Sequence, residues 1–85
     1  MLFAWDETKS AKLKEERGAS FEELREEILE GGLLGSEENP SKEGQFLLIV
    51  RLESEVWAVV AERRGERIRL VTAYPSRKWR KKYES

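Results

Sequence analysis

Residues 45–74 read QFLLIVRLESEVWAVVAERRGERIRLVTAY, the most apolar part of the chain and the part that predicts a β-sheet. It contains three runs rich in β-branched and large apolar residues, at positions 45–52, 56–62 and 67–74. Short polar turns at Glu53-Ser54-Glu55 and Arg64-Gly65-Glu66 separate the runs. Because apolar runs of this length between turn residues are typical of β-strands, the stretch predicts an antiparallel meander of three strands.

The third run alternates between two kinds of side chain, as a strand with two different faces does. The expected faces are Ile68, Leu70 and Thr72 on one side, and Arg67, Arg69 and Val71 on the other. One end of the second face is therefore expected to be strongly cationic.

Two helices are predicted ahead of the meander, after a short strand at Phe3-Ala4-Trp5. Asp6 is placed to cap a first helix that runs to Arg17, and Gly18 is placed for a left-handed stop. The segment Ser20-Phe21-Glu22-Glu23 forms a capping box, which starts a second helix that Gly31-Gly32 ends. Residues 35–44 contain many chain-breaking residues and almost no apolar ones, which predicts a loop.

A final helix is predicted after Pro75, which cannot continue a strand ladder, with Ser76 as its cap. Trp79 and Tyr83 lie one turn apart in this helix, among basic side chains. The order β, α, α, β, β, β, α predicts an α+β fold in a single domain over residues 1–85. We expect two N-terminal helices packed on an antiparallel sheet of three to four strands, with the basic C-terminal helix on or near the other face.

The chain has 85 residues and contains neither cysteine nor histidine. This length allows one modest core, so a site should lie on the surface or in a shallow groove. The missing residue types exclude a disulfide framework, a zinc finger and catalysis by histidine. No calcium-loop spacing, signal peptide or membrane span is recognisable. We therefore expect a soluble, cytoplasmic protein without a metal, a cofactor or a membrane partner.

The formal net charge is −1, but the signs are segregated along the chain. Residues 1–50 hold six Lys or Arg and twelve Asp or Glu, a net charge of −6. Residues 51–85 hold ten and five, a net charge of +5, and between Arg63 and Tyr83 nine basic residues face one acid, Glu66. Because the local field steers a ligand more than the total charge does, the C-terminal third is expected to bind a polyanion.

Four segments in a fixed order carry a resemblance to a known family: Phe3-Ala4-Trp5-Asp6 with Lys9, Gly18 to Glu23, residues 65–73 (GERIRLVTA), and the basic helix that ends in Tyr83. On these segments the chain resembles the BrnT family of toxins over nearly its whole length. The resemblance implies a RelE-like ribonuclease fold and the toxin of a type II toxin–antitoxin pair, which inhibits translation by cutting RNA. It also implies a neutralising antitoxin of the ribbon-helix-helix type, which alone would link the chain to operator DNA.

The chain departs from the family pattern in two places. Family members commonly show a Lys-His pair just before the glycine, where this chain has Glu16 and Arg17. The segment from Tyr74 to Lys78 also differs from the arginine-rich version. These differences indicate a divergent branch, in which fold transfers more safely than activity.

Metal-independent RNA cleavage needs a base for the 2′-hydroxyl, cations for the phosphate and an acid for the leaving oxygen. We expect Arg67, Arg69 and Arg77 to stabilise one phosphate, with Lys81 beside them, because guanidinium forks match phosphate oxygens. Tyr83 is the expected proton donor or orienting group, and the resemblance also covers Arg67, Arg69, Arg77 and Tyr83. The expected RNA-binding residues are Arg63, Arg64, Lys78, Arg80, Lys81, Lys82 and Lys9.

Simpler structural roles remain open for several of these residues. Tyr83 or Tyr74 can act as acid or base only if cations lower a pKa that starts near about 10, and otherwise Tyr83 packs the helix on the sheet. Glu62 is either a base or a member of an exposed ion pair. The sequence predicts Trp5 as an anchor, Asp6 as a cap, Trp57 as a core residue, and Trp79 as a core residue or a stacking platform.

Two other functions also fit the sequence. The same basic surface suits a non-catalytic module that binds nucleic acid or an acidic protein, and the missing histidine favours this alternative. A structural subunit that is stable only when another chain covers its sheet is the third possibility.

Overall fold

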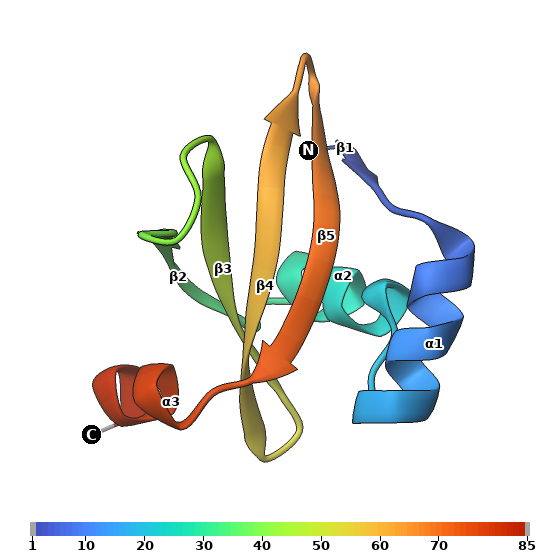
Figure 1. The fold of residues 1–85 in the computed structure, drawn as a ribbon. Coiled ribbons are helices and arrows are strands. Elements are labelled where there is room, and N and C mark those ends of the chain that lie inside the picture. Colours follow the sequence, from blue (N-terminus) through green and yellow to red (C-terminus); the bar gives the residue numbers. More distant parts are fainter. Residues whose placement is uncertain (1, 85) are drawn as a thin grey trace.

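The computed structural model describes residues 2–84 as an α+β fold, so the predicted fold class is confirmed (Figure 1). Its elements are β1 (Leu2–Ala4), α1 (Glu7–Arg17), α2 (Phe21–Leu29), β2 (Leu33–Glu38), β3 (Gln45–Leu52), β4 (Glu55–Arg64), β5 (Arg67–Pro75) and α3 (Arg77–Glu84). The two N-terminal helices precede the meander and the basic helix follows it, in the predicted order.

The sheet has five strands in the order β1-β5-β4-β3-β2, not three to four. The extra strand is β2, which occupies part of the predicted loop at residues 35–44 and pairs antiparallel with β3. Gly, Ser and Glu have low strand propensity, so β2 depends on the backbone of β3 rather than on its own side chains. At the other edge β1 pairs parallel with β5, which makes the sheet mixed.

Each face of the sheet carries its own apolar cluster. On the α1–α2 face, Phe21 and Leu24 pack with a cluster that includes Trp57, which is 2% exposed. The opposite face is the one on which α3 lies, and we call it the α3 face (Figure 1). There Trp79 and Tyr83 pack on a second cluster that contains Leu47, Ile49, Val56, Ala58 and Val60. The predicted placement of α3 on the face opposite to α1 and α2 is therefore confirmed, as is the burial of Trp57.

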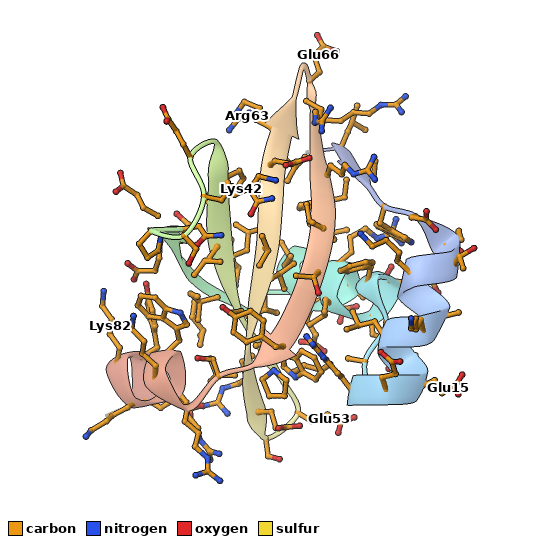
Figure 2. The ribbon with its side chains drawn as sticks, in the orientation of Figure 1. Glu15, Lys42, Glu53, Arg63, Glu66 and Lys82 are labelled. Carbon is orange, nitrogen blue, oxygen red and sulfur yellow. The ribbon has the colours of Figure 1, made fainter. Side chains whose placement is uncertain are left out.

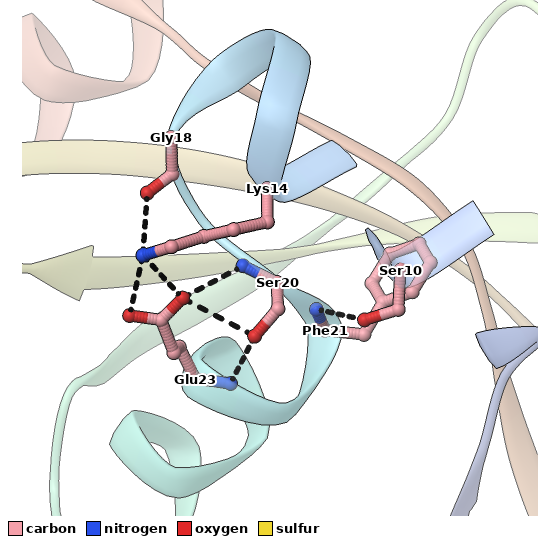
Figure 3. A network of polar contacts seen from close by, with 6 residues as sticks. All are labelled: Ser10, Lys14, Gly18, Ser20, Phe21 and Glu23. Atoms are coloured by element: carbon pink, nitrogen blue, oxygen red, sulfur yellow. Dashed lines mark hydrogen bonds and ion pairs between the residues drawn. The ribbon is translucent and has the colours of Figure 1, made fainter. Parts of the chain in front are cut away.

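The junction between α1 and α2 is held by a local polar network (Figure 3). Ser20 and Glu23 form the predicted capping box, and Lys14 Nζ pairs with the Glu23 carboxylate at 2.9 Å. This pairing, followed by the amide of Ser20, holds the pKa of Glu23 below its ordinary value. Gly18 ends α1 with a φ of 98°, the left-handed conformation expected of it.

A β-bulge interrupts β5. Val60 pairs with Thr72, whereas the next residue of β4, Ala61, pairs with Leu70. Val71 is therefore left without a partner, and the inward and outward alternation of β5 reverses beyond it. Because Val60 belongs to the cluster of the α3 face, Thr72 lies on that face, and the prediction that Thr72 shares a face with Leu70 is wrong.

Candidate nucleic-acid interface

The α3 face of β5 carries a strip of exposed polar side chains. Arg67 and Arg69 alternate with the buried Ile68 of the α1–α2 face, so both guanidinium groups lie on the α3 face. Tyr74 pairs with Ala58 of the second cluster and is 37% exposed, so it lies on the same face. Because of the bulge, an exposed phenol follows two exposed arginines on one side of one strand.

Three arginines and one glutamate gather where β4 and β5 meet at their hairpin. Arg64 lies opposite Arg67, and Glu62 lies opposite Arg69. We call Arg64, Arg67 and Arg69 the hairpin arginine cluster. Glu62 Oε1 accepts a hydrogen bond from Arg64 Nη2 at 2.7 Å, and Glu62 Oε2 accepts one from Gln45 Nε2 at 3.3 Å. These bonds, led by that from Arg64, hold the pKa of Glu62 below its ordinary value, so its carboxylate is ionised at neutral pH.

Arg77 does not join the hairpin arginine cluster. It begins α3, beyond the far end of β5. Since a strand rises about 3.3 Å per residue, the two ends of β5 lie about 26 Å apart. The prediction that Arg67, Arg69 and Arg77 meet at one phosphate is therefore wrong, and the cations instead mark the two ends of the strip.

The basic residues of α3 are all exposed, and they are Arg77, Lys78, Arg80, Lys81 and Lys82. Ser76 caps the helix, since its hydroxyl accepts a hydrogen bond from the Trp79 amide at 3.3 Å. Figure 2 shows Lys82 on α3, at the opposite end of the sheet from Arg63 and Glu66 of the hairpin. The nine basic residues of the C-terminal third thus form two groups instead of one.

Tyr83 anchors α3 instead of facing the arginines. Its hydroxyl donates a hydrogen bond to Glu37 of β2, and its ring packs on the second cluster. The bond to Glu37 raises the pKa of Tyr83 above its ordinary value. The condition for acid or base chemistry at Tyr83, a pKa lowered by cations, is therefore not met, and the alternative prediction, that Tyr83 packs the helix on the sheet, is confirmed.

Two of the expected RNA-binding residues lie away from the strip. Arg63 pairs with Ile68 of the α1–α2 face and lines a shallow pocket with Phe46. Lys9 lies on α1, where it lines a pocket with Arg17. Neither residue shares a face with the hairpin arginine cluster, so neither is expected to contact RNA that lies on the α3 face of β5.

Trp5 and Asp6 also lie beside a pocket, which the sequence around them does not indicate. The predicted cap is confirmed, because Asp6 Oδ1 accepts hydrogen bonds from the amides of Thr8 and Lys9. Both residues also line a pocket beside the hairpin arginine cluster. The parallel pairing of β1 with β5 brings Trp5 and Asp6 close to these arginines. No local pattern in the sequence predicts that pairing.

No three acidic, histidine or cysteine side chains lie close enough together within residues 2–84 to hold a metal ion. In the same described part of the chain, no helix is long and apolar enough to cross a membrane.

Basic groups that are exposed at one end of a strand and on the helix that follows its other end form a surface suited to binding a polyanion. A family model described as "Ribonuclease toxin, BrnT, of type II toxin-antitoxin system" matches residues 5–82. The chain belongs to this BrnT family of ribonuclease toxins, as the resemblance in its sequence indicated. A comparison with curated proteins gives no match.

Proposed function

We propose that this chain is an endoribonuclease toxin that binds single-stranded RNA along the α3 face of β5 and cleaves it without a metal ion. The observation that supports this most directly is the strip itself, in which Arg67, Arg69 and Tyr74 are exposed on one face of one strand. Membership of a ribonuclease toxin family supports RNA as the substrate. Cleavage of messenger RNA in the cytoplasm would then inhibit translation.

The geometry of the strip suits an extended RNA backbone better than one isolated phosphate. The hairpin arginine cluster and Arg77 lie at opposite ends of β5, a strand about 26 Å long that spans several nucleotides. Exposed Tyr74 lies on the same face, near the end of β5 that leads to Arg77, and offers a ring on which a base can stack. A groove that combines cations for the backbone with an aromatic ring for a base is the usual way to hold single-stranded nucleic acid.

The chemistry that fits this surface is attack of a ribose 2′-oxygen on its neighbouring phosphorus. The bond from phosphorus to the 5′-oxygen breaks, and the 5′-oxygen takes a proton from water. Arg67 and Arg69 stabilise the negative charge that grows on the phosphate oxygens. Glu62, which is ionised and lies opposite Arg69, is the base that takes the 2′-hydroxyl proton. In this proposal Tyr83 positions α3 and does not transfer a proton.

We further propose that a ribbon-helix-helix antitoxin neutralises the chain by covering the same surface. Its acidic and apolar side chains would lie on the hairpin arginine cluster and α3, because that surface offers the strongest docking field. Contact with operator DNA would then run only through the antitoxin.

A non-catalytic binding module is the second candidate function. The absence of histidine and the engagement of Tyr83 by Glu37 favour it, because both leave the site without an obvious proton donor. Such a module would keep salt-sensitive RNA binding and lack turnover.

The two candidates are separated by RNA cleavage with purified protein, in the presence of EDTA, for the parent, Arg67→Ala and Arg63→Ala. Arg63 is the matched control, because it is an exposed arginine of the same hairpin on the other face. We expect Arg67→Ala to lower cleavage about a hundredfold while RNA binding falls far less, and Arg63→Ala to stay near the parent. Circular dichroism checks that both variants fold.

Three outcomes would count against the toxin proposal. Equal losses of cleavage in both variants would show that cleavage does not depend on the α3 face in particular. Cleavage that EDTA abolishes would contradict a metal-independent reaction. A parent that binds RNA in a salt-sensitive way without cutting it would support the binding module.

A further inference from the structure

A shallow pocket lies beside the hairpin arginine cluster at the edge of the sheet. Its volume is about 290 Å³, and it is lined by Ala4, Trp5, Asp6, Arg64, Arg67 and Arg69. The N-terminal residues reach this place because Ala4 of β1 pairs with Arg69 of β5, after which the chain enters α1. The pocket thus joins two parts of the chain that are about sixty residues apart in sequence.

Trp5 gives the pocket a fixed aromatic wall. Its indole lies 6.3 Å from the Phe21 ring, between centroids, and the Arg25 guanidinium lies 5.4 Å from the indole centroid. Its Nε1 also donates a hydrogen bond to Glu7. Because these contacts already order the ring, stacking a base on it loses little conformational freedom. An ordered aromatic ring beside cations is the combination that holds an unpaired base next to its phosphate.

Asp6 gives the pocket a hydrogen-bond acceptor. Its Oδ1 is occupied by the amides of Thr8, at 2.8 Å, and Lys9, at 3.2 Å. Within residues 2–84, its Oδ2 accepts no hydrogen bond. An ionised carboxylate only accepts, so it pairs with the amino group of adenine, cytosine or guanine. Uracil has no amino group, and its single N–H lies between two carbonyl oxygens that repel a carboxylate.

We propose that this pocket is a nucleotide subsite for an unpaired RNA base that carries an exocyclic amino group. The base lies against Trp5, its amino group donates to Asp6 Oδ2, and its phosphate lies on Arg67 and Arg69. The inference rests on the proposed function, because the phosphate would belong to RNA that follows the strip. It goes further by assigning a base preference to two residues at the beginning of the chain.

Conservative variants separate the two contacts. Trp5→Phe keeps an aromatic ring, whereas Trp5→Leu keeps apolar packing against Phe21 and loses the stacking surface. Asp6→Asn preserves the helix cap, because Asn and Asp cap equally well. It also adds an N–H donor, which can pair with a uracil carbonyl.

The test is binding of 2′-O-methylated tetranucleotides of adenine, cytosine or uracil to the intact chain and its variants. Methylation blocks attack by the 2′-oxygen, so binding is measured whether or not the protein cleaves RNA. We expect the uracil tetranucleotide to bind the parent about tenfold more weakly than the cytosine one, and Asp6→Asn to remove most of this difference. Trp5→Leu should weaken all three about tenfold, with Trp5→Phe close to the parent.

Equal affinity for uracil and cytosine in the parent would overturn the proposal, as would a folded Trp5→Leu variant that binds like the parent. A base preference that Asp6→Asn leaves unchanged would also overturn it. The test also distinguishes loss of the base subsite from absence of ribonuclease activity. A parent that prefers amino-bearing bases but does not cut unmethylated RNA would retain the subsite and lose the nuclease.

Discussion

The Tyr83 hydroxyl of α3 donates a hydrogen bond to the Glu37 carboxylate of β2, across 46 positions of the sequence. Lys82 Nζ lies 2.8 Å from the same carboxylate oxygen. One side chain of the edge strand thus holds two side chains of the C-terminal helix. The position of the basic helix therefore depends on the protonation of all three groups.

This contact predicts a pH window for the docking of α3. Lys82, followed by Tyr83, holds the pKa of Glu37 below its ordinary value of 4.5. A lowered carboxyl pKa gives stability that is present above the unfolded value and is lost as pH falls through the folded value. Glu37 in turn raises the pKa of Tyr83 above 10.0 and that of Lys82 above 10.5. These raised values give stability that is present below the unfolded values and is lost as pH rises through the folded ones.

We therefore expect the free energy of unfolding to decrease as the pH falls below the ordinary pKa of glutamate. We expect it to decrease again as the pH rises above the ordinary pKa of tyrosine. Denaturant unfolding at a series of pH values, followed by tryptophan fluorescence, measures both limbs. Glu37→Gln should flatten both limbs, because an amide does not titrate. Unchanged pH dependence in this variant would show that other groups govern it.

Gly35→Ala is expected to loosen α3, because the Tyr83 ring lies directly on Gly35. An added Cβ would lie 2.6 Å from the Tyr83 hydroxyl oxygen and 2.9 Å from Cε1. Overpacking of this kind typically lowers the free energy of unfolding by about 1–3 kcal/mol, which chemical denaturation measures. Tyr83→Phe removes the nearest atom, so the alanine should be less harmful in that background. A double-mutant cycle with no coupling would place the effect of the alanine elsewhere.

Glu62→Gln is expected to change RNA binding and RNA cleavage in opposite directions. The substitution removes the negative charge beside the hairpin arginine cluster, so RNA should bind more tightly. It also removes the proposed base, so cleavage should fall by about tenfold to a hundredfold. Filter binding of a 2′-O-methylated RNA and single-turnover cleavage measure the two effects. Cleavage that rises together with binding would show that Glu62 is only an ion-pair partner of Arg64.

Ser10→Ala is expected to destabilise the fold without touching the strip. Ser10 is 5% exposed, and its hydroxyl accepts a hydrogen bond from the Phe21 amide at 2.9 Å, at the start of α2 (Figure 3). Loss of the acceptor leaves a buried N–H unpaired, which typically lowers the free energy of unfolding by about 1–3 kcal/mol. Ser54→Ala, in the exposed turn between β3 and β4, is the control and should change it by less than about 0.5 kcal/mol. Similar losses in both variants would contradict the role of the buried hydroxyl.

Local chemistry explains why much of the fold could be predicted from the sequence. Asp6, Ser20 and Ser76 each cap a helix as expected, because a cap needs only a side-chain oxygen and the next few amides. The strand predicted at residues 45–52 coincides with β3, because its apolar run lies inside the sheet. These features depend only on residues that are close together in sequence, so they can be predicted from the sequence alone.

The features that could not be predicted depend on partners far along the chain. β2 is a strand because its backbone pairs with the edge of β3. Gly35 of β2 has no side chain, which leaves space for the Tyr83 ring. The position of Trp5 beside the arginines likewise needs the parallel pairing of β1. No periodicity in the sequence encodes any of these.

The bulge at Val71 means that β5 is one residue longer than its pairing with β4 requires. If Val71 were deleted, Leu70 and Thr72 would become neighbours, and each would keep its present partner and its present face. Elsewhere in a strand that separates a core from a binding surface, loss of one residue exchanges inside for outside. β5 thus has spare length at its centre, which would let the chain change size there during evolution without reversing the faces of its sheet.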